Sequence, residues 1–228
     1  MRRIVPVPET ARSAHAVFTA EPLEPGADEL APPPPLLKRF GATDEQLTRL
    51  AERPFARAFV SESPLADAAE ILAATRREAL QHADEHDGVV VDLTIPRIVT
   101  HDAADIDLAV ASQWVAVDID LAAQELSTRG LEAFGLPEVV AREVTGDTMV
   151  HLIGLVMGVA HRLILEWPAN DPVGPAAITL RDVGRGFGDS EAEIMPTEPA
   201  TDVLLSYSDG VLVVVPVDDP AAMFEIAE

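Results

Sequence analysis

The stretch PLADAAEILAATRREALQHADEHDGVVVDL, residues 64–93, decides the fold that we expect for this chain. Ser63 followed by Pro64 is typical of a helix start, because serine caps free N–H groups and proline fits the first turn. Apolar side chains then recur at helical spacing as far as about residue 86, at Leu65, Ala69, Leu72, Ala79 and Ala83. Asp87-Gly88 ends the helix, and the apolar run Val89–Leu93 predicts a central strand that is buried on both faces.

The flanking sequence predicts further strands and helices. A capping box at Thr43–Gln46 favours a short helix through Glu52, and Asp147 is expected to cap a long apolar helix to about Glu166. Gly154 and Gly158 on this second helix allow close packing against a neighbouring element. Strands are predicted at residues 14–19, 55–60, 114–121, 138–144, 177–183, 203–207 and 211–217, the last two joined by a hairpin turn at Ser208-Asp209-Gly210.

These elements occur in runs of strands rather than in strict alternation with helices, which favours an α+β fold over a doubly wound sheet. We expect a mixed, largely antiparallel sheet with two long helices, residues 64–86 and 147–165, packed on one face. A proline-rich strap ends in Pro32–Pro35, which cannot donate to a ladder of hydrogen bonds. The predicted organisation is therefore an N-terminal strand plus Pro-rich strap over residues 1–40 and a single α+β domain over residues 41–228.

The acidic net charge of the chain indicates which kinds of partner it can bind. The chain has 16 Lys and Arg against 39 Asp and Glu, a formal net charge of -23, which repels nucleic acid and anionic membranes. After Arg185 there are ten acidic residues and no Lys or Arg. Such a surface serves solubility or suits a basic protein partner. We expect no nucleic-acid or membrane binding, and the sequence does not specify an oligomeric state.

The cysteine content and the apolar segments of the chain predict its cellular compartment. The chain has no cysteine, which excludes disulfides, thiolate metal sites and cysteine nucleophiles. Pro6, Pro8 and Glu9 interrupt any apolar leader, and the apolar run 149–165 is short for a membrane span and contains His151, His161 and Arg162. We expect a cytoplasmic protein. A single lysine beside fifteen arginines indicates a GC-rich bacterial genome.

Several segments carry a family likeness. They are Gly88–Asp92, Trp114-Val115, Arg129–Glu138, Leu180–Gly186 and Ser206–Val217. From about residue 64 onward the chain resembles an uncharacterised bacterial domain-of-unknown-function family, whose members pair a long helix with a Gly-x-x-x-Asp strand. The most specific part is the Gly-Leu-x-x-Phe-Gly-x-x-Glu segment, residues 130–138. The resemblance implies a fold and a bacterial cytoplasmic setting, and it transfers no catalytic residue.

One motif could hold a metal ion. His82, Glu85 and His86 spell H-x-x-E-H, in which two histidines one helical turn apart can share Zn²⁺ while the acid acts as general base. A further carboxylate would be needed, and Glu166 is a candidate. The alternative interpretation is that these histidines lie at a helix end because they face the negative end of the helix dipole, on a last turn that Asp87-Gly88 leaves prone to fraying.

Two other patterns have the residue types of a ligand site. Gly184–Gly188 resembles a phosphate-binding loop but is followed by acids and Pro196, so we expect a hairpin connection there. Asp92, Asp118 and Asp120 lie on or beside predicted strands and could hold Mg²⁺ or Ca²⁺, although alternating aspartates are also typical of the solvent-facing side of a strand. On that interpretation Val115, Val117, Ile119 and Leu121 form the opposite, buried face.

No complete catalytic constellation is present in the sequence. We therefore expect a non-catalytic binding or interaction protein with an acidic surface and no cofactor, whose partner is a basic protein. The alternative is a zinc-dependent hydrolase that uses His82, Glu85 and His86 as its metal site.

Overall fold

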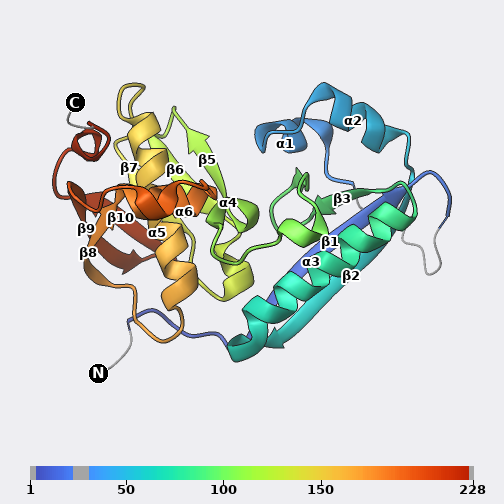
Figure 1. Cartoon of the computed structure of the whole chain (residues 1–228), viewed down its shortest axis with the longest axis horizontal. Coiled ribbons are helices and arrows are strands. Elements are labelled where there is room, and N and C mark those ends of the chain that lie inside the picture. The colour runs from blue at the N-terminus through green and yellow to red at the C-terminus, as the bar shows by residue number, and fades with distance from the viewer. Residues whose placement is uncertain (1–3, 23–30, 226–228) are drawn as a thin grey trace. The chain divides into compact units, whose positions relative to one another are not determined.

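The computed structural model describes residues 4–22 and 31–225. These form two compact units: an N-terminal unit, Glu9–Asp107, and a C-terminal unit made of the described residues of Leu108–Glu228 with those of Met1–Pro8 (Figure 1). The predicted division at residue 40 does not coincide with this one. The first strand pairs with strands on both sides of it within the N-terminal unit, so it is part of that unit's core.

The N-terminal unit is a four-stranded antiparallel sheet with helices on both faces. Its strand order is β2-β1-β3-β4, and α3 runs along β1 and β2 (Figure 1). Its elements are β1 (Thr10–Thr19), α1 (Pro34–Arg39), α2 (Asp44–Ala51), β2 (Phe55–Pro64), α3 (Ala68–Glu85), β3 (Val89–Asp92) and β4 (Arg97–Ile98).

The alternation of side chains along the strands gives this sheet two cores. On one face Val17 and Val90 pack with Ala79 and Ala83 of α3. On the other, the core consists of Ala16, Phe18, Leu37, Leu50, Ala56, Val89 and Val91, which brings α1 and α2 onto the sheet. All four residues of β3 are buried, and β3 lies between β1 and β4. The prediction of a central strand buried on both faces is confirmed.

The predicted helix starts in this unit are correct in one case and wrong in the other. The Thr43 side chain accepts from the Gln46 backbone N–H and the Gln46 side chain accepts from the Thr43 N–H, so the capping box of α2 is confirmed. Ser63 and Pro64 instead end β2, and α3 begins at Ala68 after a short 3-10 turn. Ser63 pairs with Ala11 across the sheet, and this long-range pairing prevails over its local capping preference.

The C-terminal unit is a six-stranded mixed sheet in the order β5-β6-β7-β10-β9-β8. The β7–β10 pair is parallel and the other pairs are antiparallel. Its elements are α4 (Ala111–Trp114), β5 (Ala116–Asp120), β6 (Glu125–Arg129), β7 (Val139–Arg142), α5 (Met149–Glu166), β8 (Gly174–Thr179), α6 (Leu180–Phe187), β9 (Ala200–Ser208) and β10 (Val211–Pro216).

Helix α5 is the core helix of this unit. It is the one helix among the described residues that is long and apolar enough to cross a membrane, and 61% of it is buried inside the protein. Gly158 lies against Ile178 and Val183, where an added Cβ would come within 2.8 Å of Ile178 Cγ2. The predicted close packing of the α5 glycines is confirmed. The burial is what a core helix of a globular protein shows.

Three predictions are wrong in the C-terminal unit. The N-cap of α5 is Thr148 rather than Asp147, and its side chain makes no capping hydrogen bond. Residues 180–187 form α6 rather than the end of a strand and a hairpin, because the side chains of Thr179 and Asp182 form a capping box that starts a helix. On β5, Asp118 is buried beside Arg129, whereas Leu121 beyond the strand is 58% exposed. The buried and exposed faces expected for residues 114–121 are therefore not those observed.

The α+β class is confirmed, with one mixed and one antiparallel sheet. The sequence predicts one sheet that carries both long helices. The structure contains two sheets, with α3 packed in the N-terminal unit and α5 in the C-terminal unit.

Candidate metal-binding cluster at the end of helix α3

The last turn of α3 brings together the three residues of the H-x-x-E-H motif. His82, Glu85 and His86 are separated by three and four positions, so they project from one side of the helix. One ligand atom from each residue lies within 4.8 Å of the others. Glu85 and His86 are exposed and His82 is half-buried, so the cluster is open to solvent on one side.

His82 is the best-defined of the three side chains. Its ring lies against Phe59, with centroids 5.5 Å apart, and against His86, with centroids 4.5 Å apart. Its Nε2 atom is buried and has no hydrogen-bond partner in the described structure. Burial, assisted by the nearby Arg57 and His86, lowers the pKa of His82. A neutral imidazole with a free nitrogen is the form that binds a metal ion.

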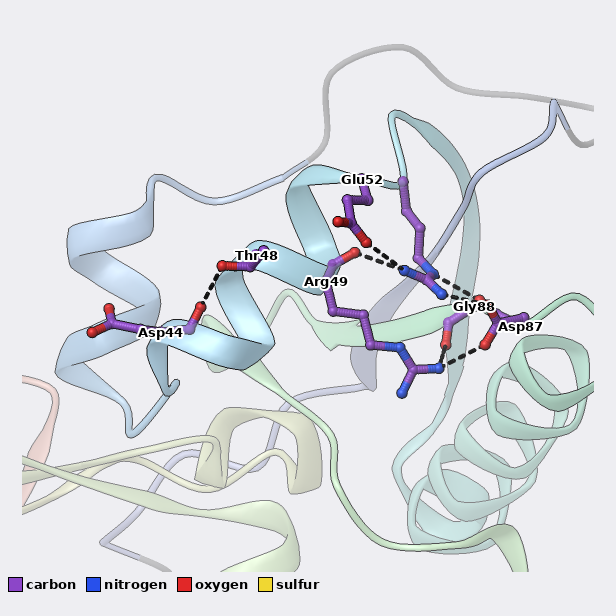
Figure 2. Close-up of polar contacts among 7 residues, drawn as sticks. Asp44, Thr48, Arg49, Glu52, Asp87 and Gly88 are labelled. Carbon is purple, nitrogen blue, oxygen red and sulfur yellow. Dashed lines mark hydrogen bonds and ion pairs between the residues drawn. The ribbon is translucent and has the colours of Figure 1, made fainter.

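The end of the helix is anchored rather than frayed. The N–H groups of His86 and Gly88 both donate to the Ala83 carbonyl. Two arginines bind Asp87: Arg53 Nη2 lies 2.5 Å from Asp87 Oδ2, and Arg49 approaches the same carboxylate, as Figure 2 shows. Arg49 Nη2 lies 2.9 Å from Asp87 Oδ1.

These bonds hold Asp87 in a left-handed conformation, with φ 48°, immediately after the cluster. The fraying expected from the sequence is therefore opposed by contacts from Arg49 on α2 and from Arg53, which follows that helix. The helix does end at this point, as predicted, and the histidines also face the negative end of its dipole.

Glu166, the acid considered as a further ligand, is already engaged elsewhere. It ends α5 in the C-terminal unit, where its Oε1 accepts from Arg162 and its Oε2 accepts from Asn170. The three aspartates considered as an ion site are likewise engaged separately. Asp92 binds Arg76 in the N-terminal unit, Asp118 lies beside Arg129, and Asp120 accepts two backbone N–H groups of its own turn.

The glycine-rich segment 184–188 and the two histidines of α5 take part in helix formation and packing. Gly184 and Gly186 lie inside α6 and Gly188 caps it with φ 75°, so the segment is neither the expected hairpin nor a phosphate loop. His161 Nδ1 lies 2.6 Å from the Ala109 carbonyl, and the His151 ring packs against Phe224. These two histidines have separate packing partners.

Sequence reasoning missed one polar cluster, which is buried between α3 and its sheet. Arg76 Nε donates to His15 Nε2 at 3.0 Å, and Arg76 Nη2 lies 2.5 Å from Asp92 Oδ2. Asp92 Oδ1 also accepts the N–H groups of Thr94 and Ile95. Because His15 Nε2 accepts, its proton is on Nδ1, which is buried without a partner in the described structure.

The electrostatics of this cluster follow from its burial. Desolvation lowers the pKa of His15 to about 4, against the opposing effect of Asp92, and lowers the pKa of Arg76 to about 10. The cluster ties α3 to β1 and β3. A signal existed in the sequence, since His15 shares its strand face with Val17, but its partner Arg76 is 61 residues away and only folding joins them.

Comparison with protein family models, with curated proteins and with solved structures finds no match for this chain. The resemblance to a bacterial family stays a prediction.

Proposed function

We propose that this chain is a non-catalytic, cytoplasmic binding protein that holds one divalent transition-metal ion of the Zn²⁺ class at His82, Glu85 and His86. The observation that carries the proposal is the convergence of three ligand atoms within 4.8 Å on an anchored helix end. Two imidazoles and one carboxylate suit zinc, nickel or copper rather than magnesium or calcium, which prefer oxygen ligands.

The same geometry supports binding over hydrolysis. A hydrolytic zinc site needs three protein ligands together with a separate general base on the metal-bound water. Here Glu85 supplies the third ligand atom, and the other acid considered, Glu166, is engaged by Arg162 and Asn170. The alternative, a zinc-dependent hydrolase with Glu85 as its base, requires Glu85 to leave the metal free for water.

The charge of the chain supports a second candidate role, binding of a basic protein. A net charge of -23 with ten acids and no basic residue after Arg185 attracts a cationic surface and repels nucleic acid. This role and metal binding concern different parts of the chain, so both can hold.

The metal test uses protein purified without a His tag, stripped with a chelator and titrated with ZnCl₂ by calorimetry. We expect one zinc ion per chain. His86→Ala should abolish the binding and leave folding intact, because His86 is exposed. His151→Ala, in the C-terminal unit, is the matched control and should bind zinc as the wild type does.

Zinc bound equally well by His86→Ala, or not bound by the wild type, would refute the metal site. Hydrolysis of ester or peptide substrates by the zinc-loaded protein, lost in a Glu85→Gln variant that keeps its zinc, would favour the hydrolase instead.

A further inference from the structure

A cavity lies beside the same end of α3 and within the N-terminal unit. Its volume is about 460 Å³, in the range of small-molecule sites. Its apolar lining comes from α3, β3, β4 and the residue that follows β4, and consists of Leu80, Ala83, Val89, Val90, Ile98 and Val99. This apolar wall can bury the body of a small organic molecule.

The cavity is separate from the metal cluster. At about 100° per residue, Leu80, Ala83 and Asp84 project from one side of α3, whereas His82, Glu85 and His86 project from the opposite side. The two sites share the helix end but no side chain. Occupancy of one therefore does not require the other.

Charge on the cavity wall is negative. Asp84, Asp87 and Asp102 line it, and Arg49 is the one cationic side chain among the residues that line it. Arg49 binds Asp87, as Figure 2 shows, and Arg53 reinforces that pairing. Asp84 and Asp102 are exposed and form no ion pair with a described residue, so they remain available to a cationic group.

His101 contributes a polar group to the same wall. Its Nε2 is buried and has no hydrogen-bond partner in the part of the chain that the structure describes. Burial, together with Arg76 and Arg97 nearby, lowers the pKa of His101 to about 4, so the ring is neutral at neutral pH. A buried polar atom without a partner is costly, and a ligand with a polar group there would relieve that cost.

We infer that this cavity binds a small organic cation with an apolar body, of the arylalkylamine class. The ammonium group lies at the rim near Asp84 and Asp102, and the apolar body packs on Leu80, Val90 and Ile98. The polar edge of the ring system hydrogen-bonds at His101. Arg76 and Arg97 lie near His101 and would repel an ammonium group placed there, so the ligand does not bind with its ammonium group at His101.

The test is calorimetric titration with three probes of one shape: tryptamine, its neutral alcohol tryptophol, and the anion indole-3-propionate. We expect saturable binding of tryptamine, weaker binding of tryptophol, and none of indole-3-propionate. Tryptamine affinity should fall as NaCl is raised, because the attracting carboxylates are exposed and screened. Equal binding of the anion would overturn the inference, as would no binding of tryptamine.

Variants locate the site. The double variant Asp84→Asn/Asp102→Asn should weaken tryptamine binding by about fourfold or more, since two exposed ion pairs are lost. Glu70→Gln, which removes one acidic charge at the start of α3, is the control and should change the affinity little. If Glu70→Gln weakens tryptamine binding as much as the double variant does, the loss reflects the overall negative charge of the protein. Asp84 and Asp102 would then not form the binding site.

A steric variant tests the position without changing charge. Thr100 lines the cavity and is exposed, so Thr100→Trp should fill the opening without disturbing the core and should abolish tryptamine binding. Unchanged affinity would place tryptamine elsewhere. His86→Ala and chelator treatment should leave tryptamine binding intact, which separates this inference from the metal proposal.

Discussion

At the scale of single residues, the decisive contacts are polar ones inside the N-terminal unit. Arg76 is 1% exposed and bridges His15 to Asp92, so one guanidinium links α3 to both β1 and β3. A buried ion pair of this kind adds little net stability by itself, but the loss of one partner leaves an uncompensated charge. The cluster therefore fixes which way α3 lies on its sheet.

The histidine of this cluster predicts how stability depends on pH. His15 has a folded pKa of about 4 and an unfolded value near 6.5, so between these values the unfolded chain binds more protons. The stabilisation is full above about pH 6.5 and is lost as the pH falls to about 4, a change of about 3 kcal/mol. Arg76, Arg97 and His101 all oppose protonation, and Asp92 favours it.

The variant His15→Gln removes this titration while its side-chain oxygen can still accept from Arg76. Thermal melts from pH 7 to pH 4.5 should show a shallower fall of Tm for the variant than for the wild type. Parallel curves would mean that His15 is not neutral in the folded protein.

At the scale of elements, β3 and α6 are packed so closely that substitutions in them should destabilise the protein. Val90 on β3 is 3% exposed and packs with Val17 and α3. Gly186 on α6 faces the backbone of α5, and an added Cβ would lie 2.7 Å from the Met157 carbonyl oxygen. A central strand and a helix crossing therefore tolerate little added polarity or volume.

For the strand, Val90→Asp buries an unpaired carboxylate and should destabilise the protein by about 3 kcal/mol or more. Val60→Asp on β2 is the control, because Val60 is 67% exposed. Chemical denaturation compares the two. An unchanged midpoint for Val90→Asp would contradict the central position of β3.

For the helix crossing, Gly186→Ala should cost about 1 to 3 kcal/mol, because overpacking against backbone outweighs the better helix propensity of alanine. Gly146→Ala is the matched control, since nothing lies within 4 Å of a Cβ added there. The control should change stability by less than about 0.5 kcal/mol. Equal effects of the two substitutions would show that α5 and α6 do not approach as closely as described.

At the scale of the whole molecule, like charge is the dominant feature. The formal net charge of -23 makes the folded chain repel itself, and the Arg185–Glu193 pair offsets only part of the excess in the last fifth of the sequence. Screening acts over about 8 Å at physiological salt, so added ions relieve repulsion between neighbouring acids.

We therefore expect Tm to rise as NaCl is increased to about 0.5 M. A variant with Asp202, Asp209, Asp218 and Glu225 changed to their amides should show a smaller rise, because all four are exposed. A basic protein partner should bind more weakly over the same range of salt. A Tm that is indifferent to salt would remove the physical support for the interaction role.

The sequence by itself determined what depends on local pattern. It predicted the α+β class, the capping box of α2, the buried strand β3, the long helix α5, the hairpin after Ser208 and the helical spacing of His82, Glu85 and His86. Each of these follows from neighbours within a few positions, where propensity, capping and periodicity act.

Only the tertiary structure decided the rest. Ser63 entered a strand and Asp118 became buried, because their pairing partners, Ala11 and Arg129, are not sequence neighbours. The same holds for the His15–Arg76–Asp92 cluster and for the cavity beside α3, which bring together segments that are distant in sequence. The division into two units also became visible only in the structure. The physical reason is that burial and electrostatic pairing act through space, and a single sequence records only the order of residues along the chain.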